Sequence, residues 1–337
     1  MIEKGEKSMP SEQYRRTCTR IGIVLLVNTL LLQVLSTVAM LVNMAKEPEI
    51  RALAEIYNIN PDEFYYAFDE VTQLLVYLIS FLIPAFLFMI LSRKSGCEPM
   101  RLGVRLEPNA PLVIIGAIGV ILTAAYLNSL MVSFIDFSSV FAMDPLDSPV
   151  KILLAFISIA IVPAVAEEFL FRGCVLSNLL PYGKTTAIVV SALLFSLMHG
   201  NFAQFFYTFV AGLVLGAVYV ETGSIWTSTF IHLFNNFYGV IQQVIYDRNP
   251  DEYTDFLLFV GDAMLPLAGL AVCGWLLYSR IKNGAPEDAA KPTKTLTLEK
   301  GEAAKGFFRP VMIAHIVVSL LLAITIVLTV LFNSYLT

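Results

Sequence analysis

Two adjacent acidic residues, Glu167 and Glu168, lie in a segment that is otherwise largely apolar. The segment 163–173 reads PAVAEEFLFRG. On insertion scales, an acidic side chain at the centre of a bilayer costs about 2.5–3.5 kcal/mol, and such residues usually mark functional sites. If this segment crosses a membrane, the pair needs a partner or a function. We therefore interpret it as the first part of a catalytic site.

The two carboxylates are predicted to have different roles. Adjacent residues on a helix point about 100° apart, so these two side chains face different directions. Glu168 and Arg172 are four residues apart, which is the favourable spacing and order for an ion pair on a helix. We expect Glu168 and Arg172 to form a positioning pair, and Glu167 to be the free carboxylate that faces a cavity.

Two of the three histidines lie in apolar segments beside aromatic or polar residues. His199 ends the segment FSLMH, in which Phe195 is four residues earlier and can pack on the imidazole ring. His232 and Asn236 are also four residues apart and are predicted to share one helical face. Asn235 points about 100° away from Asn236 and is left out of the predicted site.

A glutamate and two histidines in a dry cavity are compatible with two mechanisms of peptide hydrolysis. In the first, His199 and His232 help to bind Zn²⁺, the metal activates a water molecule, and Glu167 is a further ligand or the general base. In the second, no metal takes part. Glu167 and His199 deprotonate the water, and His232 and Asn236 donate hydrogen bonds to the oxyanion. The residues alone leave both mechanisms open.

Other hydrolase signatures are absent from the sequence. It contains neither the Gly-x-Ser-x-Gly motif of serine hydrolases nor the His-Glu-x-x-His motif of zinc proteases. The four cysteines show no paired spacing, so they indicate neither a disulfide framework nor a thiolate metal site. A serine or cysteine nucleophile is therefore disfavoured.

The composition indicates which elements position these residues. Hydrophobic residues make up 57% of the 337 residues and charged residues only 15%, against about 25% in soluble domains. Nearly all charged residues lie outside the long apolar runs or at their ends. The exceptions are Glu167, Glu168 and Asp262 within runs and Arg172 at a margin. This pattern indicates an integral membrane protein, and the net charge of −5 argues against a nucleic-acid partner.

Nine apolar runs are candidates for membrane-spanning helices, each of which needs about 20 residues. They predict an all-α fold, a polytopic transmembrane helical bundle of about nine helices, in which the fifth run is short. Asp262, in the eighth run, is interpreted as a residue that snorkels or caps a helix. The runs are residues 21–44, 71–92, 111–134, 150–180, 185–199, 203–220, 225–246, 256–279 and 310–334.

Lys and Arg predict the orientation of these helices, because both are enriched in cytoplasmic loops. With nine spans and a cytoplasmic N-terminal segment 1–20, the cytoplasmic segments hold 18 of the 22 Lys and Arg residues and the outer segments hold 4. The C-terminus is then outside. Residues 280–309 are rich in Lys, Ala, Glu and Thr and are predicted to be a flexible cytoplasmic linker to a last helix within 310–337.

The predicted helices bring two of the candidate residues to the same depth. If a hairpin turns near Gly183, Glu167 and His199 are each 16 residues from the turn, about 24 Å along their helices. His232 lies only about 13 Å past the turn at 221–224. It reaches the other two either through helix tilt or through a turn set inside the bundle, and the sequence does not decide between these alternatives.

Three motifs, in this order, resemble the CPBP family, which comprises the type II CAAX prenyl endopeptidases and their bacterial relatives and is also called the Abi family. The motifs are EExxFRG at 167–173, FxxxH at 195–199 and HxxxN at 232–236, within residues 150–246. The resemblance implies an intramembrane endopeptidase with an eight-helix core inside the bundle of residues 21–279. The helix within 310–337 would be an addition to that core.

The resemblance also implies a role for each motif residue. Glu167 would be the catalytic base with His199 beside it, and His232 and Asn236 would stabilise the oxyanion. Glu168 and Arg172 would complete the first motif. The family is described as metalloproteases, although a metal-free glutamate mechanism is also argued for it.

The expected substrates are CAAX-type proteins or membrane-associated peptide and protein precursors, in contact with a lipid bilayer. We favour a bacterial plasma membrane, because the basic N-terminal segment is short and no organelle signal is present. The alternative is a non-proteolytic membrane protein, a transporter or a scaffold, in which Glu167 and the histidines relay protons or ions.

Overall fold

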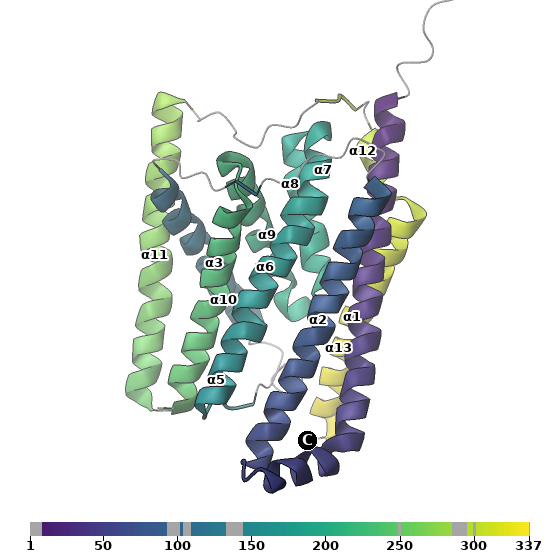
Figure 1. Cartoon of the computed structure of the whole chain (residues 1–337). Coiled ribbons are helices and arrows are strands. Elements are labelled where there is room, and N and C mark those ends of the chain that lie inside the picture. Colours follow the sequence, from purple (N-terminus) through teal and green to yellow (C-terminus); the bar gives the residue numbers. More distant parts are fainter. Residues whose placement is uncertain are drawn as a thin grey trace, which may run out of the picture.

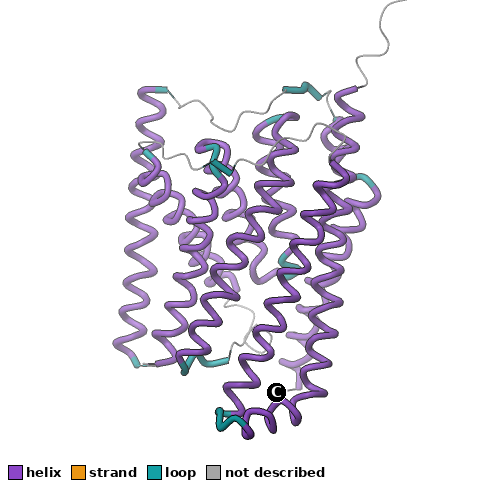
Figure 2. Tube along the Cα trace, viewed as in Figure 1, coloured by secondary structure: helices purple, strands orange, loops and turns teal. Residues whose placement is uncertain are grey.

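The computed structural model describes residues 9–92, 102–103, 109–132, 144–248, 251–284, 295–298 and 301–336. Nearly all of these residues are helical, and no strand occurs among them. Figures 1 and 2 show the long helices side by side in one bundle. The predicted all-α, polytopic fold is therefore confirmed.

The described part of the bundle consists of long helices and several short helical segments. In chain order, the elements are α1 (Met9–Ile56), α2 (Pro61–Ser92), α3 (Ala110–Val132), α5 (Pro149–Ala155), η1 (Phe156–Ile161), α6 (Val162–Glu168), η2 (Phe169–Leu176), α7 (Ser177–Leu179), η3 (Leu180–Tyr182), α8 (Lys184–Met198), α9 (Phe202–Thr222), α10 (Ile225–Arg248), α11 (Glu252–Asn283), α12 (Glu302–Phe307) and α13 (Pro310–Leu336). The segment from α5 to η3 is one nearly continuous rod with changes of helical pitch.

Each of the nine predicted runs corresponds to a helical segment, but not all of them have the character of a membrane span. Within the described part of the chain, seven segments are long and apolar enough to cross a membrane: Ser11–Ile56, Pro61–Ser92, Ala110–Val132, Pro149–Tyr182, Phe202–Thr222, Glu252–Asn283 and Pro310–Phe332. The other two runs are α8, which has only 15 residues, and α10, whose sequence includes one histidine, two asparagines and two glutamines.

The long helices α1 and α2 form a hairpin that extends past the ends of their neighbours (Figure 1). The 48 residues of α1 span about 72 Å, more than twice the hydrocarbon core of a bilayer. Polar contacts fix the two helices against each other. Asn28 Nδ2 donates to the Ser80 carbonyl at 2.8 Å, and Asn43 Nδ2 donates to Asp69 Oδ1 at 2.6 Å. These contacts set the position of α2 beside the site.

Helices α3 and α11 cross at a pair of glycines. A Cβ atom built on Gly119 would lie 2.3 Å from the Cα of Gly269, and a Cβ on Gly269 would meet Gly119 at the same distance. Only residues without side chains allow the two backbones to approach so closely, as is common where membrane helices pack. The crossing holds α11 against the helices that line the site.

Two turns decide the depth of the site residues. Gly183, between η3 and α8, has a φ of 127°, a conformation that favours glycine, and forms the predicted hairpin turn. The turn between α9 and α10 is buried, with Thr222 and Ser224 at 2% and 0% exposed. The structure therefore answers the question about His232 that the sequence left open, because this turn is set inside the bundle.

The segment between α11 and α13 is anchored where the structure describes it. The Leu296 amide donates to the Pro181 carbonyl at 2.7 Å, and the Leu296 side chain packs on the main core. Farther along, Glu302 pairs with Arg15 of α1 at 2.8 Å. Apolar and ionic contacts thus join these residues of the predicted linker to the bundle, and the flexibility of the linker stays a prediction. Residues 285–294 and 299–300 of the predicted linker lie outside the described residues.

Candidate active site

Glu167 and Glu168 end a short α-helical stretch between two π-helical turns, η1 and η2. Pro163, near the start of this stretch, explains the first irregularity. Proline has no N–H to donate to the carbonyl of Ile159, four residues earlier, and its ring crowds that carbonyl. π-Helical turns within α-helices frequently occur at functional sites. Because the two π-helical turns interrupt the regular α-helix, the two glutamates point in directions that differ from those in an uninterrupted helix.

The predicted pair between Glu168 and Arg172 is present and buried. Arg172 Nη1 lies 2.7 Å from Glu168 Oε1, and the two side chains are 1% and 0% exposed. The guanidinium also lies over the ring of Phe195, 4.9 Å from its centre, and Arg172 Nη2 donates to the Gly212 carbonyl at 3.3 Å. The arginine therefore joins the helix of the first motif to both α8 and α9.

Glu167 is held by a residue that the sequence analysis did not identify. Tyr77, on α2, donates a hydrogen bond from its hydroxyl group to Glu167 Oε1 at 2.6 Å. Glu167 Oε2 is buried and has no hydrogen-bond partner among the described residues. One oxygen is thus fixed by the protein, and the other remains available as an acceptor. Tyr77 is 90 residues away in the sequence, so no local spacing could have shown its role.

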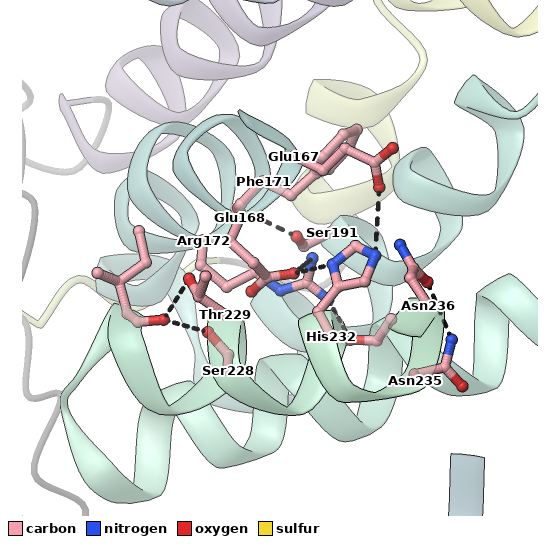
Figure 3. Close-up of polar contacts among 12 residues, drawn as sticks. Glu167, Glu168, Phe171, Arg172, Ser191, Ser228, Thr229, His232, Asn235 and Asn236 are labelled. Atoms are coloured by element: carbon pink, nitrogen blue, oxygen red, sulfur yellow. Dashed lines mark hydrogen bonds and ion pairs between the residues drawn. The ribbon is translucent and has the colours of Figure 1, made fainter. Parts of the chain in front are cut away.

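His232 lies between the two glutamates (Figure 3). Its Nδ1 is 3.1 Å from Glu168 Oε1, and its Nε2 is 3.7 Å from Glu167 Oε2. Because an ionised carboxylate can only accept, the first contact places a proton on Nδ1. Glu168 therefore contacts Arg172 and His232 together, a second role beyond the predicted positioning pair.

His199 is held at the end of α8 by Phe195. Its Nδ1 lies 2.9 Å from the Phe195 carbonyl oxygen, so Nδ1 is the donor and Nε2 is free to accept. The Phe195 ring contacts both imidazoles edge to face, with centroid distances of 5.0 Å to His199 and 5.9 Å to His232. The predicted packing of Phe195 on His199 is confirmed, and the same ring separates the two histidines.

Asn236 is oriented by two hydrogen bonds. Its Nδ2 donates to the carbonyl of Ile159 at 3.1 Å, the carbonyl that Pro163 cannot use. Its Oδ1 accepts from Asn235 Nδ2 at 3.0 Å (Figure 3). Asn235, which the sequence analysis left out of the predicted site, also lines the cavity beside Asn236. Asn235 also donates to the hydroxyl of Tyr207.

These residues line one cavity of about 320 Å³, which we call the glutamate cavity. Its walls bring together Glu167, His199, His232 and Asn236, which the sequence predicted, while Glu168 and Arg172 lie behind the wall. The cavity is also lined by residues that the sequence analysis did not place among the catalytic and supporting residues: Tyr77, Ile121, Ile159, Pro163, Phe195, Gln204, Tyr207, Thr208, Ala211, Leu215 and Asn235. Apolar side chains in the cavity wall include those of Ile121 of α3 and of Ala211 and Leu215 of α9.

The predicted zinc ligands do not form a ready-made metal site. Across the described residues, no group of three or more His, Cys, Asp or Glu side chains is placed to hold a metal ion. The donor atoms explain this result, since His232 Nδ1 faces Glu168 and His199 Nδ1 faces a backbone carbonyl. Glu167, His199 and His232 line the same cavity but are not gathered around one point.

The comparisons with known proteins identify the family of this region. Residues 149–238 match the family model described as "Type II CAAX prenyl endopeptidase Rce1-like". No curated protein and no solved structure gives a significant match to the chain. The matched segment runs from α5 into α10 and includes all three motifs and every predicted site residue. The chain therefore carries, over residues 149–238, a domain of the type II CAAX prenyl endopeptidase Rce1-like family.

Proposed function

We propose that this protein is an intramembrane endopeptidase in which Glu167 activates the water that hydrolyses a peptide bond. The membership of residues 149–238 in the Rce1-like family supports a CAAX-type protease. The observation that carries the proposal is the state of Glu167. Tyr77 fixes its Oε1, while its buried Oε2 accepts no hydrogen bond from the described residues and lies 3.7 Å from His232 Nε2 beside the cavity. A carboxylate in this arrangement can take a proton from a bound water molecule.

The proposed reaction begins with transfer of a water proton to Glu167 Oε2. The oxygen of the water adds to the scissile carbonyl carbon, and the carbonyl becomes an oxyanion. When the C–N bond breaks, Glu167 returns the proton to the leaving nitrogen, so a carboxylic acid and an amine are released. His199 Nε2, which is free to accept, helps to orient the attacking water.

The proposed oxyanion donors are His232 and Asn236. Glu168 accepts from Nδ1 of His232 and so holds the ring in place, and the proposed donor to the oxyanion is an N–H at its Nε2. Asn236 uses one N–H for the Ile159 carbonyl and has a second available. Because both donors are held by other groups before the substrate binds, they can stabilise the oxyanion with little reorganisation.

The zinc-assisted form of this mechanism stays a separate proposal. A bound zinc ion would supply Lewis-acid activation of the water, and it would need His199 and His232 to turn toward a common point with Glu167. Elemental analysis of the purified protein and assays with a chelator test this requirement. Full activity in zinc-free protein would exclude the metal-assisted form.

The proposed substrates are CAAX-type or other membrane-associated peptide and protein precursors. Seven apolar helices are compatible with a multi-pass membrane protein, so the scissile bond reaches the glutamate cavity from the bilayer or its surface. A cytoplasmic N-terminus, an outer C-terminus and a bacterial plasma membrane remain predictions, which reporter fusions at the two termini can test.

The decisive experiment compares the wild-type protein with Glu167→Gln in lipid nanodiscs. The probes are internally quenched peptides ending in a CAAX sequence, with and without a farnesyl group on the cysteine. We expect the variant to lose about 10²–10⁴-fold in kcat, the usual contribution of a general base. Glu55→Gln, an exposed glutamate at the end of α1, is the matched control. Retained cleavage in Glu167→Gln would contradict the mechanism and favour a proton or ion relay.

A further inference from the structure

A second cavity, of about 470 Å³, adjoins the glutamate cavity, and we call it the aspartate cavity after Asp262 in its wall. Both volumes lie in the range of about 300–1,000 Å³ that is usual for ligand sites. A substrate whose scissile bond lies beside Glu167 would therefore lie next to the aspartate cavity. The two cavities share the wall residues Ile159, Gln204, Tyr207, Asn235 and Asn236.

The far wall of the aspartate cavity is a polar cluster built from α10 and α11. Tyr238 Oη and Gln242 Nε2 both donate to Asp262 Oδ1, at 2.9 and 2.6 Å. Gly261 leaves room for the tyrosine, since a Cβ atom there would lie 3.1 Å from the Tyr238 hydroxyl. The tyrosine and glutamine thus hold the carboxylate at a fixed place in the cavity wall.

This position contradicts the interpretation of Asp262 as a snorkelling or capping residue. Because α11 begins at Glu252, Asp262 lies ten residues, or about 15 Å, along the helix from its start. Its side chain makes hydrogen bonds across to α10 instead of reaching the helix end. The carboxylate therefore lies in a cavity wall, within an apolar helix that is long enough to cross a membrane.

The hydrogen-bond partners of Asp262 among the described residues carry no charge. Both of its hydrogen-bond donors are neutral, and both act on Oδ1, so Oδ2 keeps its capacity to accept. Within the described ranges, no Lys, Arg or His nitrogen forms an ion pair with Asp262. Glu168, in the same bundle, has both Arg172 and His232. Carboxylates inside membrane segments almost always pair with a cation or serve a pathway, which points to a cationic ligand for Asp262.

We propose that the aspartate cavity is a substrate subsite that binds a Lys or Arg side chain close to the scissile bond. The cation of the substrate donates to Asp262 Oδ2, while Tyr238 and Gln242 keep the carboxylate in place. This inference rests on the proposed endopeptidase function, because the subsite is defined by its position beside the glutamate cavity. It makes Asp262 a determinant of specificity and not of the chemical step.

A binding experiment tests the subsite without requiring cleavage. The full-length Glu167→Gln protein in nanodiscs is titrated with octapeptides in which one Lys occupies each position in turn. Each peptide has a twin with norleucine at that position, and the series is made with and without a farnesylated cysteine. At one or two positions we expect Lys to bind about tenfold tighter than norleucine, as a charge-assisted hydrogen bond predicts. In the double variant with Asp262→Asn, we expect this preference to disappear.

Two further variants separate charge from structure. Asp262→Glu keeps the charge and is expected to retain a preference for Lys. Asp255→Asn removes an exposed carboxylate from the same helix and is expected to change nothing. The proposal is overturned if Lys and norleucine bind equally at every position or if the preference survives Asp262→Asn. It is also overturned if Asp262→Asn weakens both twins equally, which is the result expected of a purely structural clamp between α10 and α11.

A cleavage assay on the same peptides separates failure of this inference from failure of the proposed function. If the protein cleaves the peptides in a Glu167-dependent manner but kcat/KM is equal for Lys and norleucine twins, only the subsite is wrong. If the Lys preference in binding depends on Asp262 but no peptide is cleaved, the subsite stands and the endopeptidase mechanism fails.

Discussion

Glu167 and Glu168 are neighbours in the sequence, yet they belong to two regions with opposite electrostatic design. Around Glu168, Arg172 and His232 both contact the same carboxylate oxygen, and the network is closed to solvent. Around Glu167, a neutral Tyr77 holds one oxygen, and the other faces the cavity 3.7 Å from His232 Nε2. Each glutamate keeps its Oε2 without a hydrogen-bond partner among the described residues, so the guanidinium beside Glu168 is what distinguishes the two. The comparison teaches that a carboxylate compensated by the protein is used to build the site, whereas one left partly uncompensated is available for chemistry.

The largest effect is expected for Glu167→Gln, which removes the proposed general base. Glu167→Gln preserves the size of the side chain and can still accept from Tyr77, but it cannot take a proton from water. We expect kcat to fall by about 10²–10⁴-fold while the midpoint of thermal unfolding stays close to that of the wild type. Parallel measurement of kcat and of the unfolding midpoint checks this. A large loss of stability in Glu167→Gln would place this residue in the structural network as well.

The second prediction concerns Arg172, which belongs to the buried network around Glu168. Arg172→Ala leaves the buried charge of Glu168 without its guanidinium partner and removes contacts with Phe195 and Gly212. Removing one member of a buried ion pair typically costs about 3–5 kcal/mol, so we expect a loss of this size in the free energy of unfolding. Chemical unfolding of the protein in mixed micelles provides the measurement.

A matched control for this prediction is Arg280→Ala. Arg280 pairs with Glu221, and the two side chains are 35% and 23% exposed. Ion pairs near the surface contribute about 0–1 kcal/mol, so the control is expected to change the stability little. Equal losses of unfolding free energy in Arg172→Ala and Arg280→Ala would show that burial does not determine how much Arg172 contributes to stability.

The third prediction concerns Tyr77, which acts through Glu167. Tyr77→Phe removes one hydrogen bond to a carboxylate, worth about 1.5–3 kcal/mol, and so is expected to lower kcat by about ten- to a hundredfold. KM should change little, because the ring and its packing on Phe81 are kept. Tyr65→Phe, on the same helix and outside the cavity, is the control. A rise in KM with unchanged kcat would assign Tyr77 to substrate binding.

The contacts that the sequence predicted are those set by helix geometry alone. A spacing of four residues was sufficient for Glu168 with Arg172 and for Phe195 with His199, because a helix places such side chains side by side. The hairpin assumed near Gly183 placed Glu167 and His199 at the same depth, and both residues line the glutamate cavity. Likewise, the nine apolar runs predicted the bundle because hydrophobicity over about 20 residues is a strong signal.

The contacts that the sequence did not predict depend on tertiary packing or on irregular helices. Tyr77 reaches Glu167 from a helix that is far away in the chain, and no spacing encodes that approach. The buried turn at 222–225 brings His232 between the glutamates. Asn235 was excluded by an angular rule that holds for one helical face, whereas the cavity touches two faces of α10. Asp262 was misjudged because the helix begins earlier than the apolar run.

The smallest effect is expected for Asn235, whose amide orients Asn236. Asn235→Ala removes the donor to Asn236 Oδ1 and leaves the proposed oxyanion donor held only by its hydrogen bond to the Ile159 carbonyl. The loss of one neutral hydrogen bond, about 0.5–1.5 kcal/mol, predicts a two- to tenfold fall in kcat. Asn236→Ala should cost more, because it removes the donor itself. The double variant should be no worse than Asn236→Ala, since Asn235 acts only through its neighbour. Additive losses would instead show that Asn235 contacts the substrate directly, on the wall that leads to the aspartate cavity.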